Sequence, residues 1–353
     1  MVKPASSLCN LRCRYCFYHD VAAKREAYGF GFMDERTARI LVKKTLAFAD
    51  GHSVYFAFQG GEPTLAGLGF FKSFVAAVNE FNDKNCTIFY SLQTNGTLLN
   101  EEWCAFLKEN DFLVGLSLDG NQDGNRYRVD REGNYSFPKA VRAADLMSEY
   151  GVQFNILSVV TGWLADHIED QYDFLVSKGY KYIQYIPCLR PFGDRSDNPM
   201  YLTPQQYARF LVVAFNRYVR DYIKGDYTSV RGFDNWVQMA KGNRPEQCGF
   251  CGHCSHQFVV EANGNVYPCD FYCMDEYRLG NVNLMSMEAM ANGPRAEEFL
   301  RDSLYVPEKC KHCNFYGLCR AGGCRRQRES EDYCESYKTF FSCCLPLFRV
   351  FTK

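Results

Sequence analysis

Three cysteines lie within eight residues near the start of the chain, at Cys9, Cys13 and Cys16 in the stretch CNLRCRYC. A cubane iron–sulfur cluster has four irons, and each usually takes a Cys thiolate as its terminal ligand. Three thiolates on one short loop would hold three irons and leave the fourth with an open position, as catalytic metal sites do. A small molecule with an amine and a carboxylate could chelate that iron. The alternative is a zinc site completed by a distant His or Cys, although zinc sites usually use paired CxxC spacings.

A second group of closely spaced cysteines begins at Cys248. Eight of them would make two closed four-cysteine sites, which suits clusters that carry electrons rather than bind a substrate. Two zinc ribbons would satisfy the same count, so spacing alone does not choose between iron–sulfur clusters and zinc. The eight cysteines are Cys248, Cys254, Cys269, Cys310, Cys313, Cys319, Cys324 and Cys334.

The remaining cysteines are not assigned to a cluster. Cys86, Cys104 and Cys188 lie in apolar stretches, and we expect them to be small buried hydrophobic residues. Cys251 and Cys273 lie close to the proposed ligands, and either one could replace an assigned ligand. Two more cysteines form an adjacent pair near the C-terminus.

Composition narrows the class of protein. The 353 residues carry a net charge of −1, so no basic surface indicates nucleic acid or a membrane as a partner. Disulfides form in oxidising compartments, which a protein usually reaches by export. We expect no export or membrane insertion, because the N-terminus lacks an apolar signal core and no run of roughly eighteen apolar residues occurs. We therefore expect a cytoplasmic protein whose clustered cysteines bind metal.

Strand-like and helix-like segments alternate through residues 1 to about 190. After a first strand at VKPA, β-branched and aromatic runs occur at SVYFAF, CTIFYSL, FLVGLSL, VQFNILSVV and YKYIQYI. Helical patterns lie between them, at DERTARILVKKTLAFA, FFKSFVAAVNEF, EEWCAFLKEN, PKAVRAADLMSEY and ADHIEDQYDFLVSK. The alternation predicts a parallel α/β sheet of six βα units, enough for an open barrel but not for a closed one of eight. The first cysteine loop then falls at the carboxyl ends of the strands, where such folds place their chemistry.

We expect three regions, with limits at 1–190, 191–245 and 246–353. The second region starts with a turn-rich linker and continues as a long amphipathic helix, TPQQYARFLVVAFNRYVRDYIKG, with Thr203 as N-cap before Pro204. The third region has the short hairpins and loops of a cysteine-stapled domain and a C-terminal helix. Its Asn263–Gly264 turn between alternating runs predicts a hairpin.

CxxxCxxC with an aromatic residue before its last cysteine resembles the radical S-adenosylmethionine (SAM) enzymes. QGGEP (59–63), after the second strand, is similar to the segment that cradles the methionine amine of SAM in that family, and its two glycines let the backbone approach a ligand. The resemblance implies a partial (β/α)6 barrel in which the open iron binds SAM, and an electron from the cluster cleaves it to a 5′-deoxyadenosyl radical. It also implies five residues around the cofactor: Tyr15, Gly61, Ser117, Arg128 and Leu189. Arg128 would pair with a carboxylate, and a surface arginine is the alternative.

The order of the later cysteines resembles the SPASM extension of radical enzymes that modify peptides. The resemblance implies one auxiliary [4Fe-4S] cluster on Cys248, Cys254, Cys269 and Cys324, and another on Cys310, Cys313, Cys319 and Cys334. With the SAM-binding cluster this makes three [4Fe-4S] clusters. We expect the basic run RAGGCRRQR to form a solvated face that also offsets the negative charge of the thiolate-bound clusters.

KPASSLCNLRCRYCFYH, FAFQGGEPTLAG, SLQTNGTL and VVEANGNVYPCDFY are similar to the anaerobic sulfatase-maturating enzymes, and the likeness extends over nearly the whole chain. Those enzymes oxidise a Cys or Ser side chain of a sulfatase to Cα-formylglycine. The resemblance implies that Asp270, directly after Cys269, is the base that accepts the side-chain proton, whereas a turn-capping Asp is the alternative. It implies a sulfatase polypeptide in extended form as substrate, and an electron donor such as a flavodoxin or ferredoxin.

The chain departs from this pattern at three places. DGNQDGNRYR (119–128) is one residue shorter than the usual stretch and lacks its His, LCRAGGC has one residue more, and the tail carries the extra pair Cys343–Cys344. The first departure alters the mouth of the barrel and leaves the identity of the protein substrate open. The sequence also does not distinguish Cys-type from Ser-type sulfatases. An alternative is a SPASM enzyme that forms thioether or carbon–carbon crosslinks in a precursor peptide, and a zinc-ribbon interaction protein is a further one.

Overall fold

The computed structural model describes residues 1–351. They fold into two compact units, each assembled from separate segments of the chain. The first unit comprises Met1–Ser117, Arg128–Phe154 and Ser255–Leu300, and the second comprises Leu118–Tyr127, Asn155–Cys254 and Arg301 onward. The domain limits predicted near residues 190 and 245 stay a prediction.

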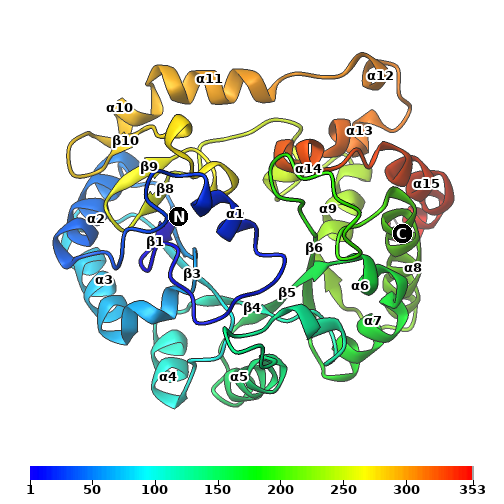
Figure 1. Ribbon diagram of the computed structural model, residues 1–353, viewed down its shortest axis with the longest axis horizontal. Coiled ribbons are helices and arrows are strands. Elements are labelled where there is room, and N and C mark those ends of the chain that lie inside the picture. The colour runs from blue at the N-terminus through cyan, green and yellow to red at the C-terminus, as the bar shows by residue number, and fades with distance from the viewer. Residues whose placement is uncertain (352–353) are drawn as a thin grey trace. The chain divides into compact units, whose positions relative to one another are not determined.

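Seven strands of the first unit form one sheet in the order β10-β9-β8-β1-β2-β3-β4 (Figure 1). The predicted parallel strands are present, with Val54 opposite Ile88 and Ser91 opposite Leu113. The predicted hairpin is also present, as strands β8 and β9. The first strand of this hairpin pairs in parallel with β1, a contact that the sequence did not predict. The strands are β1 (Val2–Lys3), β2 (Val54–Phe58), β3 (Ile88–Thr94), β4 (Leu113–Ser117), β8 (Val259–Glu261), β9 (Asn265–Tyr267) and β10 (Gly280–Asn281).

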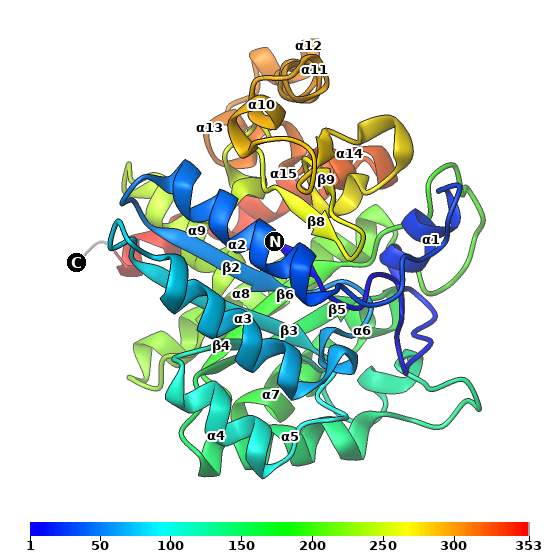
Figure 2. The same ribbon diagram turned by 90° about the vertical axis from the view of Figure 1, so that its left-hand side faces the viewer.

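Helices of the first unit cover one face of this sheet, and Figure 2 shows α2 and α3 side by side. Phe56 and Phe58 of β2 point to this face, where both rings pack on Phe74 with centroids 5.1 and 5.0 Å away. Tyr55 between them points away and is exposed, as the alternation of a strand requires. The helices are α1 (Phe17–Ala23), α2 (Glu35–Ala49), α3 (Gly67–Phe81), α4 (Glu101–Glu109), α5 (Phe137–Glu149) and α10 (Met287–Ala291).

The second unit contains three parallel strands in the order β5-β6-β7. They are β5 (Phe154–Val160), β6 (Tyr182–Pro187) and β7 (Ser229–Val230). The predicted long helix is α8 (Pro204–Ile223), and it begins with a capping box in which Thr203 and Gln206 bond each other's backbone amides.

The helix predicted at ADHIEDQYDFLVSK (165–178) is present as α7 (Ile168–Ser177), but the first two residues of the stretch belong to a separate short helix, α6 (Gly162–Asp166). α6 begins at Gly162, before the predicted stretch, because the hydroxyl of Thr161 caps it by accepting a hydrogen bond from the Leu164 amide at 3.2 Å. The break falls at His167, whose backbone leaves the helical region with φ −120° and ψ 25°.

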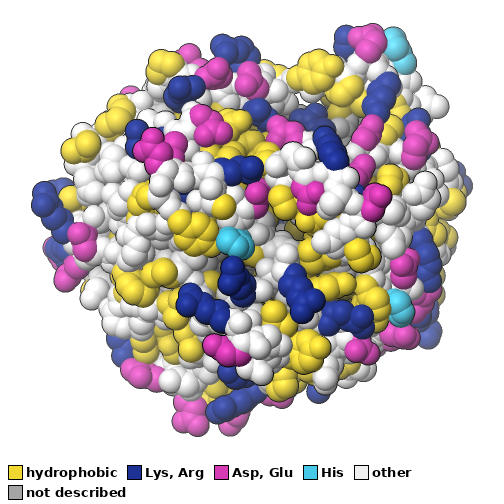
Figure 3. Space-filling view, viewed as in Figure 1, with side chains coloured by type: hydrophobic (Ala, Val, Ile, Leu, Met, Phe, Trp, Pro, Cys, Tyr) yellow, Lys and Arg dark blue, Asp and Glu magenta, His cyan; other side chains and the backbone are white. Residues whose placement is uncertain are grey.

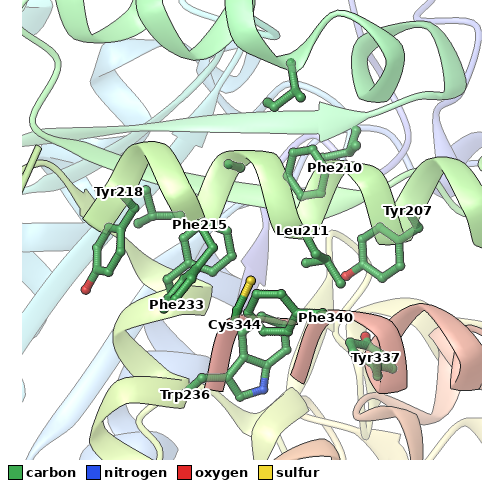
Figure 4. Close-up of a cluster of buried hydrophobic side chains, with 14 of the residues drawn as sticks. Tyr207, Phe210, Leu211, Phe215, Tyr218, Phe233, Trp236, Tyr337, Phe340 and Cys344 are labelled. Carbon is green, nitrogen blue, oxygen red and sulfur yellow. The ribbon is translucent and has the colours of Figure 1, made fainter. Parts of the chain in front are cut away.

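Aromatic side chains build the core of the second unit (Figure 4). Phe215 of α8 packs on Phe233 of α9 (Arg231–Ala240) and on Phe340 of α15 (Cys334–Cys344), with ring centroids 5.2 and 5.4 Å away. Trp236 contacts Phe340 at 4.9 Å from the other side. This core fastens the helix that begins at Cys334 to the rest of the unit.

Four more helices lie in the later part of the chain: α11 (Pro294–Ser303), α12 (Glu308–Lys311), α13 (Tyr316–Cys319) and α14 (Arg325–Ser330). Side chains of both charges are interspersed on the face drawn in Figure 3. Among residues 1–351, no helix combines the length and the apolar character needed to span a membrane.

Candidate cluster and cofactor site

The cysteine loop follows β1 and is fixed by backbone hydrogen bonds within the first unit. The Cys16 amide donates to the Cys13 carbonyl at 3.2 Å, which closes the CxxC part into a turn. The Arg12 amide donates to the Val129 carbonyl at 2.6 Å, so the middle of the loop is tied to the segment after Arg128. Cys16 itself precedes α1, and its backbone is extended at the helix start.

The GGEP segment packs directly on the backbone that leads into this loop. The Gly61 amide donates to the Ser6 carbonyl at 2.8 Å, and the Glu62 amide donates to the Leu8 carbonyl at 2.8 Å. A Cβ atom on Gly61 would lie 2.0 Å from the Leu8 carbonyl oxygen. The absence of a side chain at Gly61 is therefore required by the chain itself, before any ligand is considered.

Glu62 is buried and joins the ends of two strands beside the first cysteine. Its carboxylate accepts hydrogen bonds from the Thr94 hydroxyl and the Asn95 amide, each at 2.8 Å. The Asn95 side-chain amide in turn lies 4.0 Å from the Cys9 sulfur. Asn95 thus lies next to a proposed iron ligand; the sequence placed its segment at the carboxyl ends of the strands without singling out this residue.

Two of the predicted SAM-binding residues, Tyr15 and Arg128, lie together at this loop. The guanidinium of Arg128 lies 5.4 Å from the centre of the Tyr15 ring, and its charge acts on the Cys16 thiol. Arg128 is buried, so the alternative of a surface arginine is wrong. Ser117 is buried at the end of β4. Leu189 belongs to the second unit, where it is buried just after β6.

Asp270 carries a charged partner that sequence reasoning missed. The ammonium of Lys3 in β1 forms a salt bridge with the Asp270 carboxylate, and the two side chains are 1% and 13% exposed. Lys3 also lies over the Tyr18 ring, with its nitrogen 3.7 Å from the ring centre. Burial alone would lower the pKa of Lys3, but the charges of Asp270 and Glu261, the Cys273 thiol and the hydrogen bond to Asp270 together outweigh burial, and the pKa is raised. Lys3 therefore stays an ammonium in this buried position beside Asp270.

The Asp270 segment contacts the cysteine loop directly. Phe271, the next residue, packs edge-on against Phe17, the residue after Cys16, with ring centroids 4.9 Å apart. The charge of Lys3 also acts on the Cys16 thiol. Within one unit, the proposed base, its lysine partner and the proposed iron ligands are thus brought together.

A second buried ion pair links Arg25 to the strand β8. Arg25 donates to Glu261 of β8 at 2.6 Å, and both side chains are fully buried. The Tyr18 hydroxyl donates to the same carboxylate oxygen. Tyr18 is therefore held from two sides, by Glu261 at its hydroxyl and by Lys3 over its ring.

Two thiols of the first loop, those of Cys9 and Cys16, have raised pKa values in the absence of metal. Burial raises the pKa of Cys9 to about 12, partly offset by a hydrogen bond from the Leu11 amide. Burial also raises the pKa of Cys16. Because iron binds thiolates, cluster binding here must release the protons of these thiols.

The second unit contains a cavity of about 240 Å³ that four of the proposed ligands line. They come from α12, from the turn after it, from the end of α13 and from the start of α15: Cys310, Cys313, Cys319 and Cys334. The turn between the first two is closed by the Cys313 amide, 3.3 Å from the Cys310 carbonyl. Four thiols around a cavity of this size fit the predicted [4Fe-4S] cluster, although no three Cys, His, Asp or Glu side chains among residues 1–351 converge on a single ion.

Three ligands of the other proposed auxiliary site also lie together in the second unit. The Cys254 and Cys324 thiols both act on the pKa of Cys248, which burial raises to about 11. Cys269, the proposed fourth ligand, belongs to the first unit and follows β9 there.

The basic run beside Cys324 is not wholly solvated, so that expectation is wrong for Arg326. Its side chain is buried, donates to the Arg190 carbonyl and lies 3.9 Å from the centre of the Phe192 ring. Burial raises the pKa of Cys324, while the charges of Arg328 and Arg326 act in the opposite direction. These arginines therefore favour the thiolate that a cluster needs.

Comparisons with known proteins agree with this arrangement. The radical SAM superfamily model matches residues 4–175, and that of SPASM, an iron–sulfur cluster-binding domain, matches residues 248–314. A cysteine-type anaerobic sulfatase-maturating enzyme of Clostridium perfringens (strain 13 / Type A) is 44% identical over 356 residues, which cover 98% of this chain and 96% of the relative. The chain belongs to the anaerobic sulfatase-maturating enzymes.

Other members of this family are similar to different degrees. The cysteine-type enzyme of Clostridium novyi is 42% identical over 97% of this chain and 93% of its own length. A serine-type enzyme of Bacteroides thetaiotaomicron is 30% identical, with 94% of this chain and 83% of the relative covered.

The solved structure of native anSMEcpe with bound AdoMet superimposes with a TM-score of 0.94 at 43% identity, covering 99% of this chain and 97% of that one. Streptococcus suis SuiB shares the fold alone, at 17% identity and a TM-score of 0.62. The predicted fold class, a partial radical SAM barrel with a SPASM extension, is confirmed.

Proposed function

We propose that this protein oxidises a peptidyl cysteine of a sulfatase to Cα-formylglycine, with SAM and three [4Fe-4S] clusters as cofactors. The observation that carries the proposal is the 42–44% identity to cysteine-type enzymes over nearly the full length of both chains. The serine-type relative is 30% identical, which favours cysteine over serine as the side chain oxidised.

The residues present fit these cofactors. Cys9, Cys13 and Cys16 would hold the first cluster, and the Arg128 guanidinium would bind the carboxylate of SAM. Held there, the first cluster and SAM would supply the radical that abstracts a hydrogen atom from the substrate Cβ, and the auxiliary clusters would supply an acceptor for the remaining electron. The auxiliary ligands are those proposed from the sequence: Cys248, Cys254, Cys269 and Cys324 for one cluster, and Cys310, Cys313, Cys319 and Cys334 for the other.

Asp270 would accept the proton of the substrate thiol. Its carboxylate is 13% exposed, so one side is available to a substrate while the other is bound by Lys3. The Lys3 ammonium orients the carboxylate through their salt bridge, and a positioned carboxylate can act as a general base. Lys3 is thus a positioning residue, and Asp270 is the proposed catalytic one.

The substrate is a peptide, since a member of this family has been solved as native anSMEcpe with bound AdoMet and Cp18Cys peptide, at a TM-score of 0.93 to this chain. We propose that the sulfatase segment enters in extended form, which exposes a single side chain to the reacting carbon. A flavodoxin or ferredoxin would supply the electron that starts each turnover.

The test is anaerobic incubation of the reconstituted protein with SAM, a reductant and a sulfatase-derived peptide in which Pro and Arg follow the target Cys. Mass spectrometry should show formylglycine together with 5′-deoxyadenosine, and the same peptide with Ala at the target should stay unchanged. Cofactor cleavage without any change in the Cys peptide would refute the proposed substrate.

The variant Asp270→Asn tests the proposed base. It should lower formylglycine formation by about 10²-fold or more while all three clusters and SAM binding are retained. Asp226→Asn is the matched control, because Asp226 forms an exposed salt bridge with Lys181. Unchanged product formation by Asp270→Asn would remove the role assigned to this carboxylate.

A further inference from the structure

The side chain of Asn95, directly after β3, is held between the cysteine loop and the turn that follows the strand, all within the first unit. Its terminal oxygen accepts hydrogen bonds from the Thr97 amide at 2.9 Å and from the Thr97 hydroxyl at 2.6 Å. Its terminal nitrogen donates to the side-chain oxygen of Asn10, the residue after Cys9, at 2.9 Å. The side-chain nitrogen of Asn10 donates in turn to the Thr97 hydroxyl at 2.8 Å, which closes a ring of three side chains.

This ring determines which end of the Asn95 side chain faces the cysteine. A backbone amide can only donate, so the atom that the Thr97 amide contacts must be the Asn95 oxygen, and the other terminal atom is the nitrogen. That nitrogen donates one hydrogen to Asn10 and lies 4.0 Å from the Cys9 sulfur. The backbone amide of Leu11 approaches the same sulfur at 3.4 Å. Because Asn95 is only 8% exposed, its N–H is held beside the sulfur in a largely buried position.

A donor held beside an iron ligand influences the cluster that the ligand binds. Iron binds the thiolate form of cysteine, and an N–H directed at a negatively charged acceptor makes a stronger hydrogen bond than one directed at a neutral acceptor. Reduction adds one negative charge to the cluster, so the same N–H stabilises the reduced state more than the oxidised state. Hydrogen bonds to the sulfurs are accordingly among the features that set the reduction potential of an iron–sulfur cluster.

We propose that Asn95 is a positioning residue of the first cluster, whose side-chain N–H points at the Cys9 sulfur and raises the reduction potential of that cluster. The inference rests on the assignment of Cys9 to the SAM-binding cluster in the proposed function. Asn10 and Thr97 hold the Asn95 amide in this orientation. No bond to Asn95 forms or breaks during reduction, and the electron comes from the external donor of the proposed function.

The experiment is an anaerobic redox titration of the reconstituted, full-length protein without peptide. Electron paramagnetic resonance identifies the first cluster as the reduced signal that changes when SAM is added. Asn95→Leu, which keeps the approximate size but removes the N–H, should make reduction of this cluster about tenfold less favourable, a fall of about 59 mV in the midpoint potential for one electron.

The matched control is Thr97→Val, because it removes the hydroxyl that bonds Asn10 and Asn95 but leaves the N–H beside Cys9. Its reduction equilibrium should stay within about twofold of the wild type. An unchanged midpoint potential in Asn95→Leu, or an equal fall in both variants, would overturn the proposal.

Asn95→Asp covers the case in which Asn95→Leu does not retain the first cluster. It keeps the size and the oxygen that Thr97 contacts, but places an oxygen instead of a nitrogen beside the Cys9 sulfur, so the midpoint potential should fall at least as far. An unchanged midpoint would overturn the proposal. Loss of the first cluster from both Asn95 variants, measured as iron per chain, would also overturn it, since Asn95 would then be purely structural. A wild type without any SAM-dependent signal would instead refute the cofactor assignment of the proposed function, so the two failures are distinguishable.

Discussion

The salt bridge between Lys3 and Asp270 makes a quantitative prediction for Lys3→Met, which keeps the length of the side chain but removes its charge. Removing one partner of a buried ion pair costs about 3–5 kcal/mol, because it leaves the other charge without compensation. The Asp270 side chain is 13% exposed, and water can partly solvate it, so we expect the lower end, about 3 kcal/mol. The matched control is Lys181→Met, whose pair with Asp226 is 45% and 66% exposed and should contribute at most about 1 kcal/mol.

The pH dependence of this effect follows from the direction of the pKa shift. The pKa of Lys3 in the folded protein is raised above its ordinary value of 10.5. A raised pKa means that the folded state binds the proton more tightly, so the stabilisation is fully present below pH 10.5. It is lost as the pH rises through the folded-state pKa, and the difference between wild type and Lys3→Met should shrink there.

The same variant should separate cofactor cleavage from product formation. Without its ammonium partner, the Asp270 carboxylate is no longer held in position, whereas the three cysteines of the first loop are all still present. A general base contributes about 10²–10⁴-fold, so even partial loss of its position should lower the ratio of formylglycine to 5′-deoxyadenosine by about tenfold. Lys3→Arg should restore part of this ratio, because it returns the charge.

The assays are urea unfolding of the anaerobic, cluster-loaded protein, followed by tryptophan fluorescence, and quantification of both products by mass spectrometry. If Lys3→Met unfolded at the same urea concentration as Lys181→Met and kept the wild-type product ratio, the ion pair would contribute neither to stability nor to positioning. A loss of stability with an unchanged product ratio would leave Lys3 a purely structural role.

Two further predictions concern a glycine and a helix N-cap, and each has a control substitution nearby in the sequence. Gly61→Ala should displace the backbone at Leu8 and lower iron incorporation at the first loop, measured as iron per chain, whereas Gly69→Ala in α3 has open space and should be neutral or slightly stabilising. Asp34→Ala removes the N-cap of α2 and should cost about 1 kcal/mol in urea unfolding, while Arg36→Ala, exposed in the first turn, should stay within about 0.5 kcal/mol.

The regular elements were predictable because local patterns determine them. The alternation of VYFAF in β2, with Phe56 inward and Tyr55 outward, is visible in the sequence and correct in the structure. Thr203, predicted as the N-cap before Pro204, is also the N-cap of α8 in the structure. The sequence did not predict the break at His167, because the stretch ADHIEDQYDFLVSK contains no glycine or proline, the usual signals of a helix break.

For the site, the sequence predicted which residues belong to it but not the contacts that hold them in place. The cysteines and the GGEP segment have spacings that identify them, and Cys86, Cys104 and Cys188 are buried as predicted. Lys3 was not recognised, because a lone lysine in an apolar strand has no local signal and its partner lies 267 positions away. Its role follows only from long-range packing.

That packing explains why the position of Asp270 depends on the first strand. Lys3 in β1 lies opposite Glu261 in β8, so the pairing of these two strands determines where the hairpin begins and hence where Asp270 follows it. Lys3 then binds Asp270, and Glu261 binds Tyr18 two residues after Cys16. The strand that leads into the iron-binding loop is thus the same strand that holds the proposed base. A shift of this two-residue strand should displace both the cluster loop and the carboxylate, because each is bonded to it or to its partner strand.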